Sequence, residues 1–267
     1  MIKKILAIIL ATITIALFLV ISSENEYFEV VFLDVGQGDA SLIRFPDGFY
    51  VLIDGGPDNL VLNRLGEYLP FNRRNLDLII VSHWHDDHIV GLMEVLDRYR
   101  VGSLMYMAGA EQTDLARSIL KKASKKGVKI IPINKEIKIS RQTCSLNILS
   151  PLSLGVPENG NNSLVTRLEC LGLKFLFSGD NELAVEKALL SLNRDWRADV
   201  FKASHHGSKT SNSQAFLEAV NPKLIAISVG LDNKFNHPAH EIIEIIKFLG
   251  IKIKRTDQDS SIEIRMN

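Results

Sequence analysis

Three of the seven histidines of this chain fall within six residues, in the run His83-Trp84-His85-Asp86-Asp87-His88. His83 and His85 are one residue apart, and in an extended stretch such alternate side chains share a face. Asp87 and His88 follow at a turn and can reach a second point nearby. Imidazole and carboxylate ligands at this density suit Zn²⁺, Mn²⁺ or Fe²⁺. The crowding favours a two-metal site over the alternative, an exposed polar loop rich in histidine.

The elements around this run predict that it lies on a loop between a strand and a helix. Residues 76–81 are apolar except for Asp77, which is typical of a strand buried on both faces. Apolar residues then recur at helical spacing from Ile89 to Leu96, so we expect a helix to begin immediately after His88. A loop of this kind can aim several side chains at one point.

The remaining chain predicts an α/β (α+β) fold. We expect strands over 27–33, 41–44, 49–53, 128–131, 146–149, 164–170, 174–177, 200–203 and 224–227, and from residues 251 and 262. We expect helices over 61–69, 113–126, 181–192, 213–220 and 241–249. Strands outnumber helices and occur in runs, which favours two packed mixed sheets with helices on their outer faces.

The bulk composition is that of an ordinary globular protein. Apolar residues make up 46% and charged residues 23%, which excludes a disordered chain. Lys+Arg and Asp+Glu are both 31, so there is no bulk attraction to DNA or to an anionic membrane surface. A local basic groove is compatible with this balance.

The N-terminus resembles a membrane-targeting segment. Lys3 and Lys4 are followed by 17 uncharged, mostly aliphatic residues over 5–21. We therefore divide the chain into residues 1–24, a membrane anchor or signal peptide, and residues 26–267, a single domain. The positive-inside tendency places the lysines in the cytoplasm and the domain outside it, either anchored or secreted. We favour an uncleaved anchor, because residues 20–22 make a mediocre cleavage site.

The two cysteines, Cys144 and Cys170, are too few for a disulfide framework or a zinc knuckle. Both lie in apolar, strand-like surroundings, which favours two buried free thiols. A single cross-strand disulfide is the alternative if the domain is extracytoplasmic.

The H-x-H-x-D-H run resembles the signature loop of the metallo-β-lactamase superfamily, whose fold is an αββα sandwich with a one- or two-metal site at its edge. Six further motifs are similar, in order, to those of the hydrolase domain at the end of ComEC/Rec2 DNA-uptake proteins and of their free-standing relatives. They are Phe32–Ala40, Leu52–Gly56, Asn161–Val165, Phe177–Asp180, Ser204–Ser208 and Asn236–Pro238. The resemblance therefore covers nearly all of residues 26–267 and implies a hydrolase domain of this fold.

The resemblance also implies the ligands of two divalent metal ions, Zn²⁺ or Mn²⁺. His83 and His85 would hold the first ion, and Asp87 and His88 the second. Asp180 would bridge both, because a carboxylate accepts two cations where a neutral ligand could not.

Further positions would complete or support the site. One imidazole of His205 and His206 would complete the second metal site, and we favour His205 because it is nearer the end of a strand. The other would bind phosphate or support the ligands. Asp54 would orient the metal-binding loop through hydrogen bonds.

Two features are candidates for substrate contacts. Ser208 and Lys209 lie on the loop Gly207–Ser211, where backbone N–H groups and the lysine could bind a phosphate. An ordinary flexible turn is the alternative. His237 could act as a general acid toward a leaving oxygen, or it could have a structural role. With Asp87 and Asp180 it makes up the expected catalytic set.

One departure from the family pattern concerns the metal. No histidine lies between His88 and Asp180, so the third imidazole that many superfamily zinc enzymes place on the first metal is absent. Asn162 occupies that region and would contact the site or the substrate. The oxygen-richer site favours Mn²⁺ or mixed occupancy over obligate zinc. The departure also disfavours a β-lactam-hydrolysing enzyme or a glyoxalase-like thioesterase.

The resulting hypothesis is a hydrolase of phosphodiesters, with extracytoplasmic DNA as one such substrate. A bound metal lowers the pKa of water to about 7 and so supplies hydroxide at neutral pH. One alternative is hydrolysis of a lactone, amide or carboxylic ester at the same metals. Another is a non-catalytic module of an uptake or secretion assembly. The single hydrophobic segment means that any uptake role requires a separate membrane pore protein.

Overall fold

The computed structural model describes residues 4, 9, 12–13, 27–157 and 159–266. The expected anchor or signal peptide over residues 1–24 lies almost entirely outside these residues, and it stays an expectation. Among the residues that the structure describes, no helix is both long enough and apolar enough to cross a membrane.

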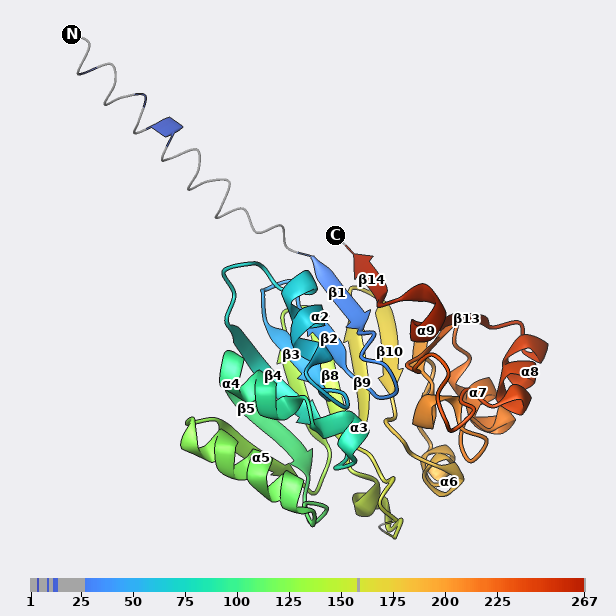
Figure 1. Cartoon of the computed structure of the whole chain (residues 1–267). Coiled ribbons are helices and arrows are strands. Elements are labelled where there is room, and N and C mark those ends of the chain that lie inside the picture. Colours follow the sequence, from blue (N-terminus) through green and yellow to red (C-terminus); the bar gives the residue numbers. More distant parts are fainter. Residues whose placement is uncertain (1–3, 5–8, 10–11, 14–26, 158, 267) are drawn as a thin grey trace.

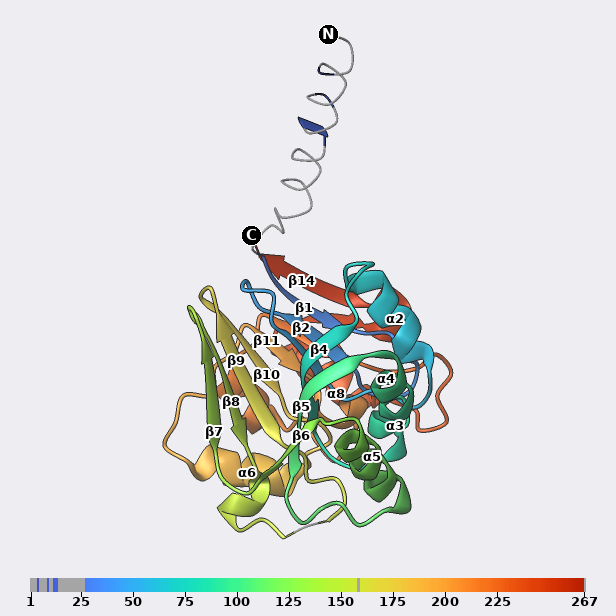
Figure 2. The same cartoon turned by 90° about the vertical axis from the view of Figure 1, so that its left-hand side faces the viewer.

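Two seven-stranded sheets form the centre of the fold, as the strand pattern predicts (Figure 2). The first has the strand order β14-β1-β2-β3-β4-β5-β6. Its strands from β3 to β6 run parallel, and the others pair antiparallel. The strand bounds are β1 Phe28–Phe32, β2 Ser41–Arg44, β3 Tyr50–Ile53, β4 Asn75–Val81, β5 Arg100–Met107, β6 Lys129–Ile133 and β14 Ile262–Met266.

The second sheet has the order β13-β12-β11-β10-β9-β8-β7. Its strands from β10 to β13 are parallel, and β7 to β10 form an antiparallel meander. The bounds are β7 Ile137–Arg141, β8 Cys144–Leu149, β9 Val165–Cys170, β10 Leu173–Phe177, β11 Val200–Lys202, β12 Leu224–Ile227 and β13 Lys252–Arg255.

Helices cover the outer face of each sheet (Figures 1 and 2). The first sheet carries α2 (Leu60–Tyr68), α3 (Asp86–Ile89), α4 (Leu92–Arg98) and α5 (Asp114–Lys125). The second carries α6 (Leu183–Ser191), α7 (Gln214–Val220) and α8 (His240–Phe248). Short turns at η1 (Pro151–Leu154), η2 (Ser204–Gly207) and α9 (Thr256–Asp259) connect these elements.

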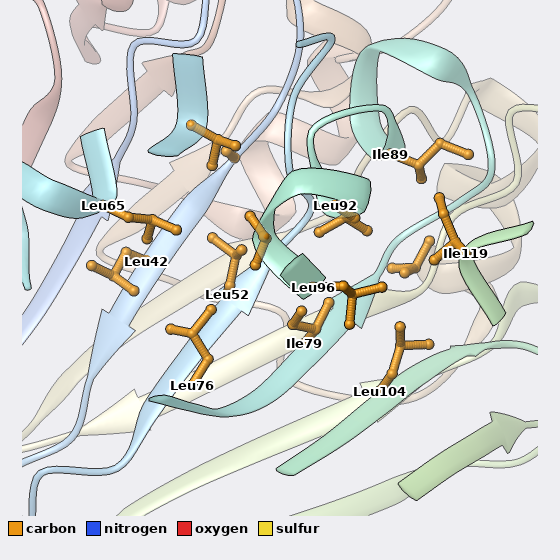
Figure 3. Close-up of a cluster of buried hydrophobic side chains, with 14 of the residues drawn as sticks. Leu42, Leu52, Leu65, Leu76, Ile79, Ile89, Leu92, Leu96, Leu104 and Ile119 are labelled. Carbon is orange, nitrogen blue, oxygen red and sulfur yellow. The ribbon is translucent and has the colours of Figure 1, made fainter. Parts of the chain in front are cut away.

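The strands are apolar on both faces because each sheet lies between two apolar layers. In β1, Phe28 and Phe32 point into the layer between the sheets, where their rings lie 5.7 Å from those of Phe175 and Phe177. Val31 points the other way, into the layer beneath the helices. Figure 3 shows that outer layer, with leucines and isoleucines of β2 to β5 packed against α2, α4 and α5.

Two strands and the state of the cysteines differ from the sequence-based expectations. Strands β5 and β7 were not expected, because β5 mixes polar and apolar residues and β7 alternates between half-buried and exposed positions at a sheet edge. Cys144 and Cys170 do not remain free thiols but form a disulfide. They lie directly opposite each other on β8 and β9, since Ser145 pairs with Glu169 in the antiparallel register.

Candidate metal centre

The histidine run lies at the carboxyl end of β4, where the parallel part of the first sheet meets the second sheet. The strand ends at Val81, and helix α3 begins at Asp86. His83 and His88 are buried, and His85 is exposed. The run follows a buried strand, as the sequence predicts, but the helix begins at Asp86 and not after His88, so Asp87 and His88 lie within α3.

Two neighbouring loops hold the backbone of this run in place. The carbonyl of Asp87 accepts from Asp39 N at 3.1 Å, and the carbonyl of His88 accepts from Gly55 N at 2.7 Å. A Cβ atom on Gly38 would lie 2.2 Å from the Asp87 carbonyl oxygen. Glycine is therefore required at position 38, because any side chain would push the Asp87 backbone away.

Asp180 is the carboxylate that two groups of ligand atoms share. In one group Asp180 lies with Asp87, His88 and His206, and in the other with His83 and His85. Within each group, one ligand atom from every residue lies within 4.8 Å of all the others. The nearest approach of Asp180 is 3.3 Å, from its Oδ1 to His88 Nε2. The sequence-predicted ligands thus come together, and one carboxylate faces both groups.

The unpaired atoms of these groups fit bound cations. His83 Nε2, His88 Nε2 and Asp180 Oδ1 are buried and have no hydrogen-bond partner among the described residues. Unpaired buried polar atoms cost free energy, and native proteins rarely leave several together. Here they converge, and the carboxylate and the neutral form of each imidazole are electron-pair donors that suit divalent ions. The residues present therefore fit two such ions.

Asp54 fixes the orientation of His88. Its carboxylate accepts from Ser82 N at 2.7 Å and from Ser82 Oγ at 2.6 Å, and it lies 2.9 Å from His88 Nδ1. An Nδ1–H donated to Asp54 leaves Nε2 of His88 as the atom that faces Asp180. A carboxylate behind a ligating histidine sets its tautomer and raises its basicity.

His206, rather than the favoured His205, is directed into the second ligand group. Both lie on η2 with left-handed backbone angles, φ 49° for His205 and φ 53° for His206, and their ring planes are 65° apart. His206 is buried, its Nδ1 lies 2.9 Å from the Ser228 carbonyl oxygen, and its Nε2 lies 3.2 Å from Asp87 Oδ2. His205 is partly exposed, with Nε2 3.7 Å from Asp180 and Nδ1 3.7 Å from Glu182. The prediction favoured His205 because it is nearer the strand end, and it did not take the left-handed backbone of η2 into account.

Asp180 is held by a small polar network. It follows β10 through Ser178 and Gly179, and its backbone N–H donates to Ser163 Oγ at 2.9 Å. Asn181 accepts from Ser163 N and donates to the Ser163 carbonyl, both at 2.8 Å. The sequence pattern assigned no role to either residue, although Ser163 lies in the motif Asn161–Val165 and Asn181 directly follows the motif Phe177–Asp180.

A buried ion pair behind the site was also missed. Lys202 is 2% exposed, and its ammonium donates to the carboxylate of Asp39. The other oxygen of Asp39 lies 3.4 Å from His206 Nδ1. The available signal was a lysine within the buried strand β11, just before the histidine pair. The carboxylate of Asp39 neutralises the charge of Lys202, and this ion pair packs against His206.

The electrostatics of the second group follow from its carboxylates. Burial alone would lower the pKa of His88, but Asp180 and Asp54 outweigh burial and hold that pKa well above 6.5. Burial would also lower the pKa of His206, but Asp180 and Asp39 outweigh burial and raise that pKa to about 9. Burial would raise the pKa of Asp180, but His88, His206 and His83 hold it well below 3.8.

The first group differs in charge. Burial, followed by the nearby charge of His88, lowers the pKa of His83 well below 6.5, so its imidazole is neutral. Asn162 lies beside it, in a pocket lined by His83, His85 and Gly160. The amide Nδ2 of Asn162 donates to the Pro157 carbonyl at 2.8 Å, and its buried Oδ1 is unpaired within the described part of the chain. An amide oxygen is thus available where the third imidazole is missing.

The expected phosphate loop after the histidine pair offers fewer donors than predicted. The backbone N–H groups of Ser208, Thr210 and Ser211 already donate within the loop, to His205 O, Ser208 Oγ and Ser208 O. Lys209 is exposed and remains available for a substrate contact. A backbone anion cradle is therefore not formed by these three groups.

His237 lies beside the histidine pair, with its ring 5.6 Å from His205 and 6.2 Å from His206. Burial, followed by the charges of His206 and His205, lowers its pKa to about 4. The imidazole is therefore neutral at pH 7, which disfavours a stored proton for general-acid catalysis. A neutral ring can still donate one hydrogen bond to a leaving oxygen.

The fold and this cluster of carboxylates and imidazoles define a metal-dependent hydrolase built as an αββα sandwich. The family model for the metallo-beta-lactamase superfamily matches residues 33–230. The chain therefore belongs to the metallo-β-lactamase superfamily.

Named relatives confirm the resemblance to ComEC/Rec2 proteins. ComE operon protein 3 of Bacillus subtilis (strain 168) is 29% identical over 262 residues, which cover 92% of this chain and 33% of that protein. Competence protein ComA of Neisseria gonorrhoeae is 27% identical over 244 residues, with 90% and 32% covered. The chain thus spans about a third of the length of these relatives.

Solved structures share the fold at much lower identity. The metallo-beta-lactamase fold protein YhfI from Bacillus subtilis superposes with a TM-score of 0.59 at 12% identity, covering 88% of this chain and 99% of that one. This similarity concerns the fold alone.

Proposed function

We propose that this chain is a metal-dependent phosphodiesterase. The observation that carries the proposal is the position of Asp180, whose carboxylate faces two separate ligand groups. Enzymes that hold two metal ions on either side of a shared ligand commonly cleave phosphate esters, because the pair contacts both the attacking and the leaving oxygen. The relatives bear names from competence and recombination, which is compatible with a nucleic-acid substrate.

The residues have separate tasks in this proposal. His83, His85 and Asp180 would hold one divalent ion, and Asp87, His88, His206 and Asp180 the other. The bound ions would supply a nucleophile from water at neutral pH and would neutralise charge on the phosphate. The chain itself fixes the ligands: Asp54 and the Ser228 carbonyl hold the Nδ1 atoms of His88 and His206.

The open face of the site suits an anionic substrate. Lys209 is exposed on the loop after the histidine pair, and the ring of His237 lies beside that pair. Lys209 would bind a phosphate oxygen, and the neutral His237 would donate a hydrogen bond to the leaving oxygen. The net charge of zero means that attraction to a polyanion depends on such local groups.

An extracytoplasmic location completes the proposal. The basic and aliphatic pattern of residues 1–24 favours export or anchoring. The disulfide between Cys144 and Cys170 supports the same location, because disulfides persist in oxidising compartments.

The test is turnover by the full chain together with its metal content. Purified protein is loaded with Mn²⁺ or Zn²⁺ and assayed on bis-p-nitrophenyl phosphate, DNA, choline phosphodiesters, lactones and carboxylic esters. We expect hydrolysis of the phosphodiesters, loss of activity and of bound metal in Asp180→Ala, and neither loss in Asp114→Ala. Asp114 is a matched control because its side chain is 99% exposed. Hydrolysis of lactones or carboxylic esters alone would replace the proposed substrate class, and two bound metals without any turnover would indicate a non-catalytic module.

A further inference from the structure

A row of nearly parallel rings leads from the metal centre to the surface. His237 stacks on His206, with ring centroids 6.2 Å apart and planes 25° apart. Phe235 stacks on His237, with centroids 5.8 Å apart and planes 24° apart. Phe235 is 53% exposed, so the row ends in an aromatic ring that is open to solvent. The row begins at a residue of the second ligand group.

The loop that carries Phe235 is held firmly in this position. We call residues 231–237, between β12 and α8, the rim loop. The side chain of Asn233 donates to the carbonyls of Gly230 at 3.0 Å and His237 at 2.7 Å, and it accepts from His237 N at 3.0 Å. Its ends are also tied, since Gly230 N donates to Gln37 Oε1 at 3.1 Å and Ala239 N to the Gly207 carbonyl at 2.9 Å.

This firm loop nevertheless exposes apolar side chains. Leu231 at the start of the loop is 75% exposed, and Phe235 lies four residues further along the chain. Scattered exposed apolar residues need no explanation, but a rigid loop that holds an aromatic ring beside a buried polar site resembles a binding platform. The ammonium of the exposed Lys234 lies over the face of the Phe235 ring, 5.1 Å from its centroid, so a base that stacks on this face displaces Lys234 toward the neighbouring phosphate. A flat apolar surface with an adjacent positive charge matches a nucleobase and its phosphate.

We propose that the rim loop is the nucleobase platform of this enzyme, on which Phe235 stacks the base of the nucleotide next to the scissile phosphate. This inference rests on the proposed phosphodiesterase function and specifies its substrate as a nucleic acid with an unpaired base at the site. Every base has an aromatic face, so stacking on Phe235 carries no sequence preference. Lys234 binds the phosphate that follows the stacked base.

The experiment measures binding to the Mn²⁺-loaded full chain by fluorescence anisotropy. The two probes are a labelled oligothymidylate and an abasic strand of the same length, both with phosphorothioate linkages so that cleavage does not interfere. We compare Phe235→Ala with Phe235→Tyr, which keeps an aromatic ring. Phe71→Ala is the matched control, because Phe71 is 89% exposed and precedes β4, at the opposite end of that strand from the histidine run.

We expect wild type to bind oligothymidylate more tightly than the abasic strand. Phe235→Ala should weaken oligothymidylate binding by about fivefold to 150-fold, the range for one aromatic–base stack, and leave the abasic strand unchanged. Phe235→Tyr and Phe71→Ala should bind both strands as wild type does. Equal binding of the two strands by wild type, or an equal effect of Phe235→Ala on both, would overturn the platform.

Cleavage assays separate this inference from the function on which it rests. If Phe235→Ala loses the preference for oligothymidylate but the Mn²⁺-loaded wild type hydrolyses no phosphodiester, the platform stands and the proposed activity fails. If phosphodiesters are hydrolysed and Phe235→Ala cleaves oligothymidylate with an unchanged KM, the activity stands and the platform fails.

Discussion

Loading the second ligand group with metal should release about two protons at pH 7. A histidine binds a metal only as a neutral imidazole, so a protonated histidine must first lose its proton. His88 has a pKa held well above 6.5 by Asp180 and Asp54, and His206 has a pKa of about 9 because of Asp180 and Asp39. Both are therefore protonated in metal-free protein at pH 7.

The size of the effect follows from these two groups. At pH 7, two units below a pKa of about 9, His206 is about 99% protonated. Because binding releases two protons, the apparent metal affinity should rise by as much as about 100-fold per pH unit below neutrality. The rise should become shallower as the pH passes through the pKa of His206, near pH 9. The apparent metal affinity must increase with pH, because protons and the metal compete for the same Nε2 atoms.

Calorimetric titration of metal-stripped full chain measures this release. Titrations at pH 7 in two buffers of different ionisation enthalpy give the number of protons released per metal bound. In His83→Ala, which confines binding to the second group, we expect about two. Adding His206→Ala should reduce the number to about one, and adding the exposed-site control His240→Ala should not change it. Release near zero in His83→Ala at pH 7 would refute the proposed charge state of the site.

Four further outcomes are expected. Asp180→Ala and His83→Ala should each abolish hydrolysis and reduce bound metal while circular dichroism stays unchanged; near-normal turnover with full metal content would contradict the ligand assignment. Reducing the disulfide between Cys144 and Cys170, which are 26 residues apart, should lower the free energy of unfolding by about 3–4 kcal/mol in urea titrations, and an unchanged midpoint would count against this. Metal-stripped enzyme should be reactivated more by millimolar Mn²⁺ than by stoichiometric Zn²⁺, with Asn162→His shifting the preference toward zinc; two Zn²⁺ retained through dialysis against chelator, with no gain from Mn²⁺, would refute this. A reporter fused to the C-terminus should be active only outside the cytoplasm and should fractionate with membranes, and cytoplasmic activity would contradict the topology.

Local patterns were sufficient to predict the position of the histidine run. The apolar run over 76–81 became β4, and the helical spacing after His88 became α4, with the short α3 before it. Buried strands and amphipathic helices have strong periodic signals because both depend on which faces are covered. Strand β5 has a weaker signal because Arg100 and Gly102 interrupt its apolar pattern.

Contacts between distant segments were not predictable in the same way. The choice between His205 and His206 depends on left-handed backbone angles and on the carbonyl of Ser228, 22 residues away from His206. The pair of Lys202 with Asp39 joins residues 163 positions apart. Such contacts follow from how the two sheets meet, and a single sequence does not contain that geometry.

Because β1 pairs with β14, the first and last strands of this domain lie side by side. Phe28 and Met266 are register partners, so the two ends of the domain leave from the same edge, as Figure 1 shows. The histidine run and Asp39 lie beyond the opposite, carboxyl ends of β4 and β1. Sequence joined to either end therefore emerges away from the edge that carries the candidate metal centre. The domain can therefore be inserted into a longer polypeptide chain without blocking the site. A circularly permuted chain that links these two ends should still form the same site.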